Sequence, residues 1–85
     1  MDSNEIQKRV HEYVVESFLF GEDDELSSDD QSFLDSGLID STGILELIHF
    51  VEDSFEIEIE DEEMIPENLD SIARVTAFVG SKVEG

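Results

Sequence analysis

Apolar residues recur at helical spacing in three stretches of this chain, and this periodicity restricts it to a small helical fold. In the stretch 42–55 they form one stripe, made of Ile44, Leu47, Ile48, Val51 and Phe55. The stretches 3–18 and 71–79 repeat the pattern, with Ile6, Val10, Tyr13, Val14 and Phe18 in the first and Ile72, Val75, Phe78 and Val79 in the second. A stripe with a period near 3.6 residues is typical of an amphipathic helix with one buried face. The 85 residues suffice for one domain with a small core, which we expect to span residues 1–85.

The segments between these helices are predicted to be pinned connections. Residues 21–40 form a long link that five apolar side chains should hold across the core, namely Leu26, Phe33, Leu34, Leu38 and Ile39. Gly37 is expected to make a tight turn with a positive φ. The alternating stretch 55–60 has no partner strand, so we interpret it as an extended connection, and a short helix is expected over 61–65, ended by Pro66. The sequence therefore predicts an all-α, small four-helix bundle with three longer helices and one short third helix.

Charge narrows the classes of partner. The chain has 24 acidic and 4 basic residues, a formal charge of −20. This charge excludes nucleic acid as a direct partner, disfavours an anionic membrane surface and favours basic proteins. No cysteine is present, so no disulfide or thiolate site is expected. Because the first residues are acidic and no apolar run is long enough to span a membrane, we expect a cytoplasmic protein. We also expect it to be a monomer.

Asp40 and Ser41 stand where the long connection meets the second helix. A serine at this junction has two interpretations. It can cap the helix by accepting a backbone N–H, or it can carry an anionic group such as a phosphate, which the N–H groups and the helix dipole favour. The dipeptide taken alone does not decide between them.

The run Leu38-Ile39-Asp40-Ser41, followed by a helix containing Leu45-Glu46-Leu47, resembles the attachment motif of acyl carrier proteins. The similarity covers nearly the whole chain, including Glu67-Asn68-Leu69-Asp70-Ser71-Ile72 at the start of the last helix. It implies a four-helix bundle with one short helix. It also implies that Ser41 carries 4′-phosphopantetheine and that Asp40 helps to present it to a phosphopantetheinyl transferase.

The same resemblance implies a carrier and not an enzyme. Acyl or aminoacyl groups would be loaded as thioesters by an adenylating ligase. They would then pass to a downstream acyltransferase or synthase in fatty-acid, polyketide, nonribosomal-peptide or related biosynthesis. We expect partners to dock on the open face of the second helix, at Thr42, Leu45, Glu46, His49, Glu52 and Asp53. Fatty-acid carriers usually have Leu and then an acidic residue after the serine, whereas Thr42-Gly43 here is similar to D-alanyl and other aminoacyl carriers.

Other interpretations remain open. The chain could be an acidic helical adaptor that binds a basic protein, with Ser41 only a cap and the acidic residues only a solvated face. A catalytic triad is disfavoured because His49 lies two turns from Ser41, more than ~10 Å by helical rise alone. His11 and His49 make no obvious metal pair. The acidic loop residues lack the ligand order of a calcium loop, so no dedicated metal site is expected at Asp23, Asp24, Asp29 and Asp30.

Overall fold

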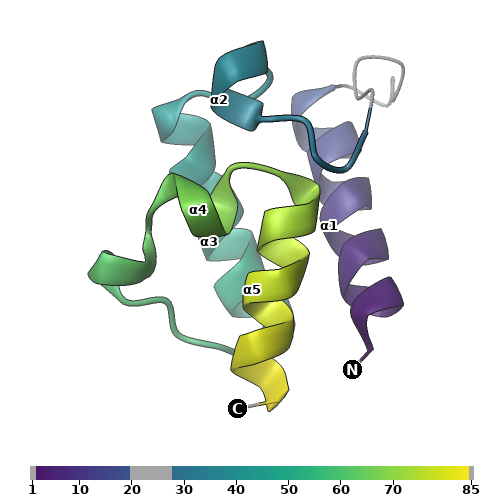
Figure 1. Ribbon diagram of the computed structural model, residues 1–85, viewed down its shortest axis with the longest axis vertical. Helices are drawn as coiled ribbons and strands as arrows, with labels where there is room; N and C mark the ends of the chain where they lie inside the picture. The colour runs from purple at the N-terminus through teal and green to yellow at the C-terminus, as the bar shows by residue number, and fades with distance from the viewer. Residues whose placement is uncertain (1, 20–27, 85) are drawn as a thin grey trace.

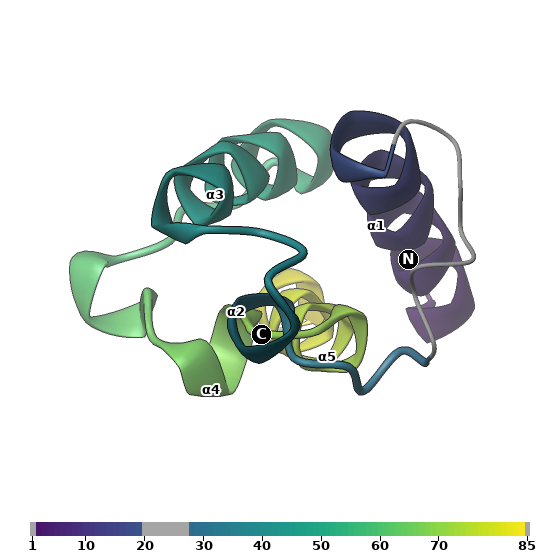
Figure 2. The same ribbon diagram turned by 90° about the horizontal axis from the view of Figure 1, so that it is seen from above.

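Three long helices surround a common core in the computed structural model, which describes residues 2–19 and 28–84 (Figures 1 and 2). They are α1 (Ser3–Phe18), α3 (Ser41–Phe55) and α5 (Ile72–Glu84). Helices α3 and α5 run in the same direction and α1 runs against them (Figure 1). The short elements are α2 (Phe33–Ser36), the 3-10 helix η2 (Asp61–Glu63) and α4 (Pro66–Leu69). The described part contains no strand, so the predicted all-α bundle with three longer helices is confirmed, although it has three short helical elements where one was expected.

The core is built from the predicted stripes. Each long helix contributes buried side chains. They are Ile6, Val10 and Val14 on α1, Leu47, Ile48, Val51 and Phe55 on α3, and Ile72, Val75 and Val79 on α5. Phe18 and Phe78 are only half-buried against its edge. Tyr13 also lies at this edge, where its ring stacks on that of Phe50 with the centroids 4.0 Å apart, joining α1 to α3. Aromatic stacking of this kind adds to the area buried between two helices.

The connection before α3 is pinned at two of its predicted positions. Phe33 and Ile39 are buried, and the Phe33 N–H donates to the Asp70 carbonyl at 2.7 Å. Gly37 has φ +76°, as the tight turn requires. Leu38 is half-buried, whereas Leu34 is 41% exposed, so its expected place in the core is wrong. Its backbone is fixed instead, because the Leu34 N–H donates to Asp70 Oδ1 at 3.1 Å, and the predicted role of Leu26 lies outside the described residues.

The extended connection predicted over 55–60 is shorter, because Phe55 still belongs to α3 and Glu56 has φ +54°. Residues 57–60 form neither helix nor strand, and the segment after them differs from expectation. The short helix predicted over 61–65 is a single 3-10 turn, η2, and Pro66 begins α4 where it was expected to end a helix. Proline fits the first turn of a helix because the N–H that it lacks would have no partner there. The last helix begins at Ile72 and continues through Gly80 to Glu84.

Salt should stabilise this fold. With 24 carboxylates and 4 basic side chains, most of the acidic groups have no cationic partner and repel one another. Raising sodium chloride from about 10 to 150 mM shortens the Debye length from roughly 30 to 8 Å, so that much of this repulsion is screened. We expect the melting temperature, followed by circular dichroism, to rise over this range. An unchanged melting temperature would show that self-repulsion does not limit stability.

Candidate functional site

The start of α3 is shaped by an aspartate cap. Asp40 has extended backbone angles, and its Oδ1 accepts the N–H of Gly43 at 2.8 Å. The Asp40 carbonyl also accepts the Ile44 N–H at 2.9 Å, which begins the helical ladder. Ile39, directly before the cap, is 1% exposed and anchors the loop in the core. The buried residue and the cap together fix the direction in which α3 leaves the loop.

Ser41 is the first residue of α3, and it is exposed. Within the part of the chain that the structure describes, its hydroxyl makes no hydrogen bond. Because Asp40 fills the capping position, the interpretation of Ser41 as the cap is wrong. A hydroxyl that stabilises no part of the helix end and faces solvent is free to act as a nucleophile towards an enzyme-bound donor.

Two other Asp–Ser pairs at helix starts provide comparisons. Before α5, Ser71 is 2% exposed and its Oγ accepts the Arg74 N–H at 3.1 Å, so this serine does serve as a cap. At α1, Asp2 caps through the Glu5 N–H at 2.9 Å and leaves Ser3 exposed, as Asp40 leaves Ser41. The dipeptide therefore occurs in two geometries. Ser41 differs from Ser3 in the residues that surround it.

An apolar groove of about 250 Å³ adjoins Ser41. It lies between α3 and the α4 region, and its other lining residues are Leu34, Ile44, Leu45, Ile48, Met64, Ile65, Pro66 and Leu69. Three of these are large apolar side chains left exposed to solvent, with Leu45 at 53%, Leu34 at 41% and Ile65 at 40%. Sequence reasoning missed the groove because it placed Leu34 in the core and gave α4 no role. Exposed apolar side chains that gather at one place mark a surface for binding.

The residues predicted to contact partners fall into separate groups. Leu45 is exposed and lines the groove beside Ser41, while Thr42 is exposed outside it. The other four line a shallow hollow against α1, shared with Tyr13 and Phe50: Glu46, His49, Glu52 and Asp53. In this hollow, burial raises the pKa of the Tyr13 phenol, with a further contribution from the nearby Glu46 carboxylate and an opposing one from a hydrogen bond with Ser17. The structure therefore does not bring the six predicted residues together into one patch.

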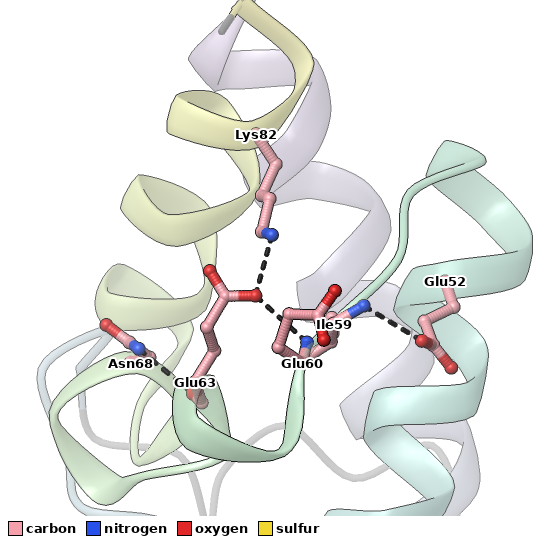
Figure 3. Close-up of polar contacts among 6 residues, drawn as sticks. All are labelled: Glu52, Ile59, Glu60, Glu63, Asn68 and Lys82. Atoms are coloured by element: carbon pink, nitrogen blue, oxygen red, sulfur yellow. Dashed lines mark hydrogen bonds and ion pairs between the residues drawn. The ribbon is translucent and has the colours of Figure 1, made fainter.

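Glu52 is half-buried, unlike its three exposed neighbours in the hollow. Its Oε2 accepts the N–H of Ile59 at 2.9 Å and so holds the segment that follows α3 (Figure 3). The carboxylate of Glu52 therefore has a structural partner, which the sequence pattern did not indicate. All four basic residues lie on α1 and α5, so the acidic side chains of α3 have no basic residue on their own helix.

Within residues 2–19 and 28–84, no group of three or more acidic, histidine or cysteine side chains is arranged to hold a metal ion. His11 Nδ1 lies 4.0 Å from Asp29 Oδ1, and this pair joins α1 to the loop before α2. Asp23 and Asp24 lie outside the described residues. None of the helices in the same described ranges combines the length and apolar character needed to cross a bilayer.

Comparison with known proteins identifies the family. No protein-family model matches the chain. Over all 85 residues of both chains, the sequence is 36% identical to an acyl carrier protein of Akkermansia muciniphila. The chain belongs to the acyl carrier protein family. The resemblance drawn from its motifs is thereby confirmed, and the helical bundle with an exposed serine at the start of α3 is consistent with an acyl carrier protein.

Proposed function

We propose that this acyl carrier protein bears 4′-phosphopantetheine on Ser41 and carries an acyl or aminoacyl group as a thioester. One observation carries the assignment: Ser41 lines the apolar groove, and its exposed hydroxyl has no hydrogen-bond partner among the described residues, at a helix start that Asp40 already caps. When attached, 4′-phosphopantetheine supplies the thiol that the chain lacks, since the sequence contains no cysteine. The protein then acts as a carrier, and the chemistry belongs to its partner enzymes.

The start of α3 fits a phosphodiester on Ser41. The N–H groups of Gly43 and Ile44 bond to Asp40, while those of Ser41 and Thr42 have no acceptor among the described residues. Free N–H groups and the positive end of the helix dipole favour an anion at this position. For an exposed charge, the dipole contributes about 0.3–1 kcal/mol. The carboxylate of Asp40 is held on Gly43, which leaves the hydroxyl of Ser41 accessible to a transferase.

We propose two regions of α3 for partner enzymes. The transferase, the adenylating ligase and the downstream acyltransferase or synthase must all reach Ser41, so each meets the adjoining Leu45. Glu46, His49 and Asp53 lie further along the helix, where the acidic pair would attract a basic surface. Long-range attraction accelerates encounter more than it tightens the complex, which suits a carrier that must also be released.

The groove beside Ser41 is a candidate binding site for the carried group. Its lining is almost wholly apolar, so we propose that it shelters the apolar part of a carried acyl or aminoacyl group. Gly43 has a separate explanation, because a Cβ at this position would lie only 2.6 Å from Ile39 and 2.9 Å from Phe18. The Thr42–Gly43 pair is therefore a weaker indication of aminoacyl cargo than its similarity to aminoacyl carriers implied.

Attachment of 4′-phosphopantetheine can be tested by mass spectrometry of the intact protein. The purified chain is incubated with coenzyme A, magnesium and a broad-range phosphopantetheinyl transferase. We expect a mass increase of one phosphopantetheinyl group, located by fragmentation on the peptide that contains Ser41. No increase, while a control carrier is modified in parallel and circular dichroism shows a helical fold, would contradict the proposal and favour the acidic adaptor.

A further inference from the structure

One wall of the apolar groove belongs to residues 60–68, a segment that contains no buried side chain. Ile59 before it and Leu69 after it are 6% and 2% exposed, but no side chain between them is buried. Met64, Ile65 and Pro66 in this segment line the groove. The core therefore holds both ends of the wall, while in its middle the half-buried Met64 packs against the core and the rest depends on other contacts.

Polar contacts that meet at Glu63 hold that middle part (Figure 3). Its Oε1 accepts the Glu60 N–H at 2.9 Å, which closes a capping box around η2. The same oxygen lies 2.6 Å from Nζ of Lys82 on the last turn of α5. The Glu63 carbonyl accepts the side-chain amide of Asn68 at 2.9 Å. The ion pair thus ties η2 to α5, and a second contact from α5 reaches the wall, since Arg74 Nη1 donates to the Glu67 carbonyl at 3.2 Å. The pairing with Lys82 lowers the pKa of the Glu63 carboxyl, with the Glu60 N–H adding to the effect.

The acidic residues around this ion pair increase its importance. Residues 60–63 are four consecutive carboxylates, and of the described basic side chains only Lys82 pairs with any of them. The Lys82 ammonium lies 5.7 Å from the centre of the Phe78 ring, which helps to keep it on this side of α5. Without Lys82, adjacent like charges would repel one another with no cation to bind the turn to the bundle. The η2 end of the wall would then separate from α5 more easily, while Arg74 still holds Glu67.

We propose that the Lys82–Glu63 ion pair is a latch that sets how readily the groove beside Ser41 opens to an apolar chain. The occupant is the apolar part of the carried group, so this inference rests on the proposed function. If the carried group enters the groove only when the wall moves, its apparent affinity falls in proportion to the fraction of molecules in the open state. Lys82 is then a positioning residue that selects cargo by the cost of opening, although it lies on a different helix from Ser41.

The first test measures opening of the wall by amide hydrogen exchange. All variants carry Ser41→Ala, so the result does not depend on attachment. Lys82→Met removes the cation and Lys82→Arg retains it, while Glu63→Gln keeps an acceptor for the Glu60 N–H. Lys8→Met on the exposed face of α1 is the control with the same change in net charge. In Lys82→Met we expect the amides of Glu63, Met64 and Asn68 to exchange about threefold faster, a factor within the range measured for exposed ion pairs.

The control variants define what would contradict the latch. Lys82→Arg and Lys8→Met should leave these three amides unchanged, and Glu63→Gln added to Lys82→Met should produce no further acceleration. Equal exchange in Lys82→Met and Lys8→Met would overturn the proposal. A uniform acceleration that includes the core amides of Val14 and Val51 would also overturn it, because the effect would then be on global stability.

The second test measures binding of an aliphatic molecule in the groove. Decanol, a neutral aliphatic probe, is titrated into the same variants and followed by the chemical shifts of Leu45 and Ile65. We expect its dissociation constant to fall by the factor found for exchange, about threefold in Lys82→Met. A looser wall with unchanged decanol affinity would overturn the role in admission. Because Ser41 is absent from every variant, failure of attachment and failure of the latch are separate results.

Discussion

Replacing Ser41 with alanine is expected to abolish transfer of the phosphopantetheinyl group and to leave the fold as stable as before. The hydroxyl is the proposed point of attachment, so intact mass should show no modified protein. Asp40 caps α3 and the Ser41 side chain is exposed, so the free energy of unfolding should change by less than about 0.5 kcal/mol. Urea denaturation checks the second part. A capping serine would instead cost about 0.5–2 kcal/mol when removed.

The chain contains a matched control for this substitution. Ser3 follows a capping aspartate at the start of α1 and is exposed, as Ser41 is, but it is not among the residues that line the groove. Ser3→Ala should therefore be modified like the unaltered protein, and Asp40→Ala should lose about 1 kcal/mol of stability with the cap. Modification that persists in Ser41→Ala, or disappears in Ser3→Ala, would place the attachment elsewhere.

The long helices could be predicted because their buried faces repeat along the sequence. The stripe from Ile44 to Phe55 needs only the helical period to be recognised, and the same holds for α1 and α5. Leu34 was misplaced because an apolar residue in a connection carries no periodic signal. Its exposure follows from Phe33 next to it, which enters the core while Asp70 fixes the backbone of both residues. That contact joins residues far apart in the sequence, and local pattern does not show it.

The candidate site shows the same division. The motif that joins Asp40 and Ser41 to the helix that follows makes Ser41 the candidate for attachment, and this role stays a prediction. The roles within the pair could not be predicted, since Asp–Ser before α5 has the serine as cap and Asp–Ser before α3 has the aspartate. The groove also escaped prediction because its wall depends on where Pro66 starts α4 and on the pairing of Lys82 with Glu63. Those features depend on tertiary contacts between the connection and α5.

Gly43→Ala is expected to destabilise the protein, by about 1–3 kcal/mol. A Cβ at this position would lie 2.6 Å from Cγ2 of Ile39 and 2.9 Å from Cε1 of Phe18, closer than two carbon atoms can approach. Ile39 is buried at the start of α3, so it cannot move aside without disturbing the core. The better helix propensity of alanine, worth up to about 1 kcal/mol, offsets only part of this strain. Urea denaturation of both proteins measures the difference.

Gly80→Ala is the matched control, since Gly80 lies inside α5 and a Cβ there would have no atom within 4 Å beyond its chain neighbours and the backbone of α5 itself. The same substitution should there stabilise the protein by up to about 1 kcal/mol, because propensity acts alone. Opposite signs at the two glycines would show that Gly43 is required by the packing of α3 on Phe18. If Gly43→Ala were as stable as Gly80→Ala, packing would not explain the glycine after Thr42, and its similarity to aminoacyl carriers would regain weight as an indication of cargo.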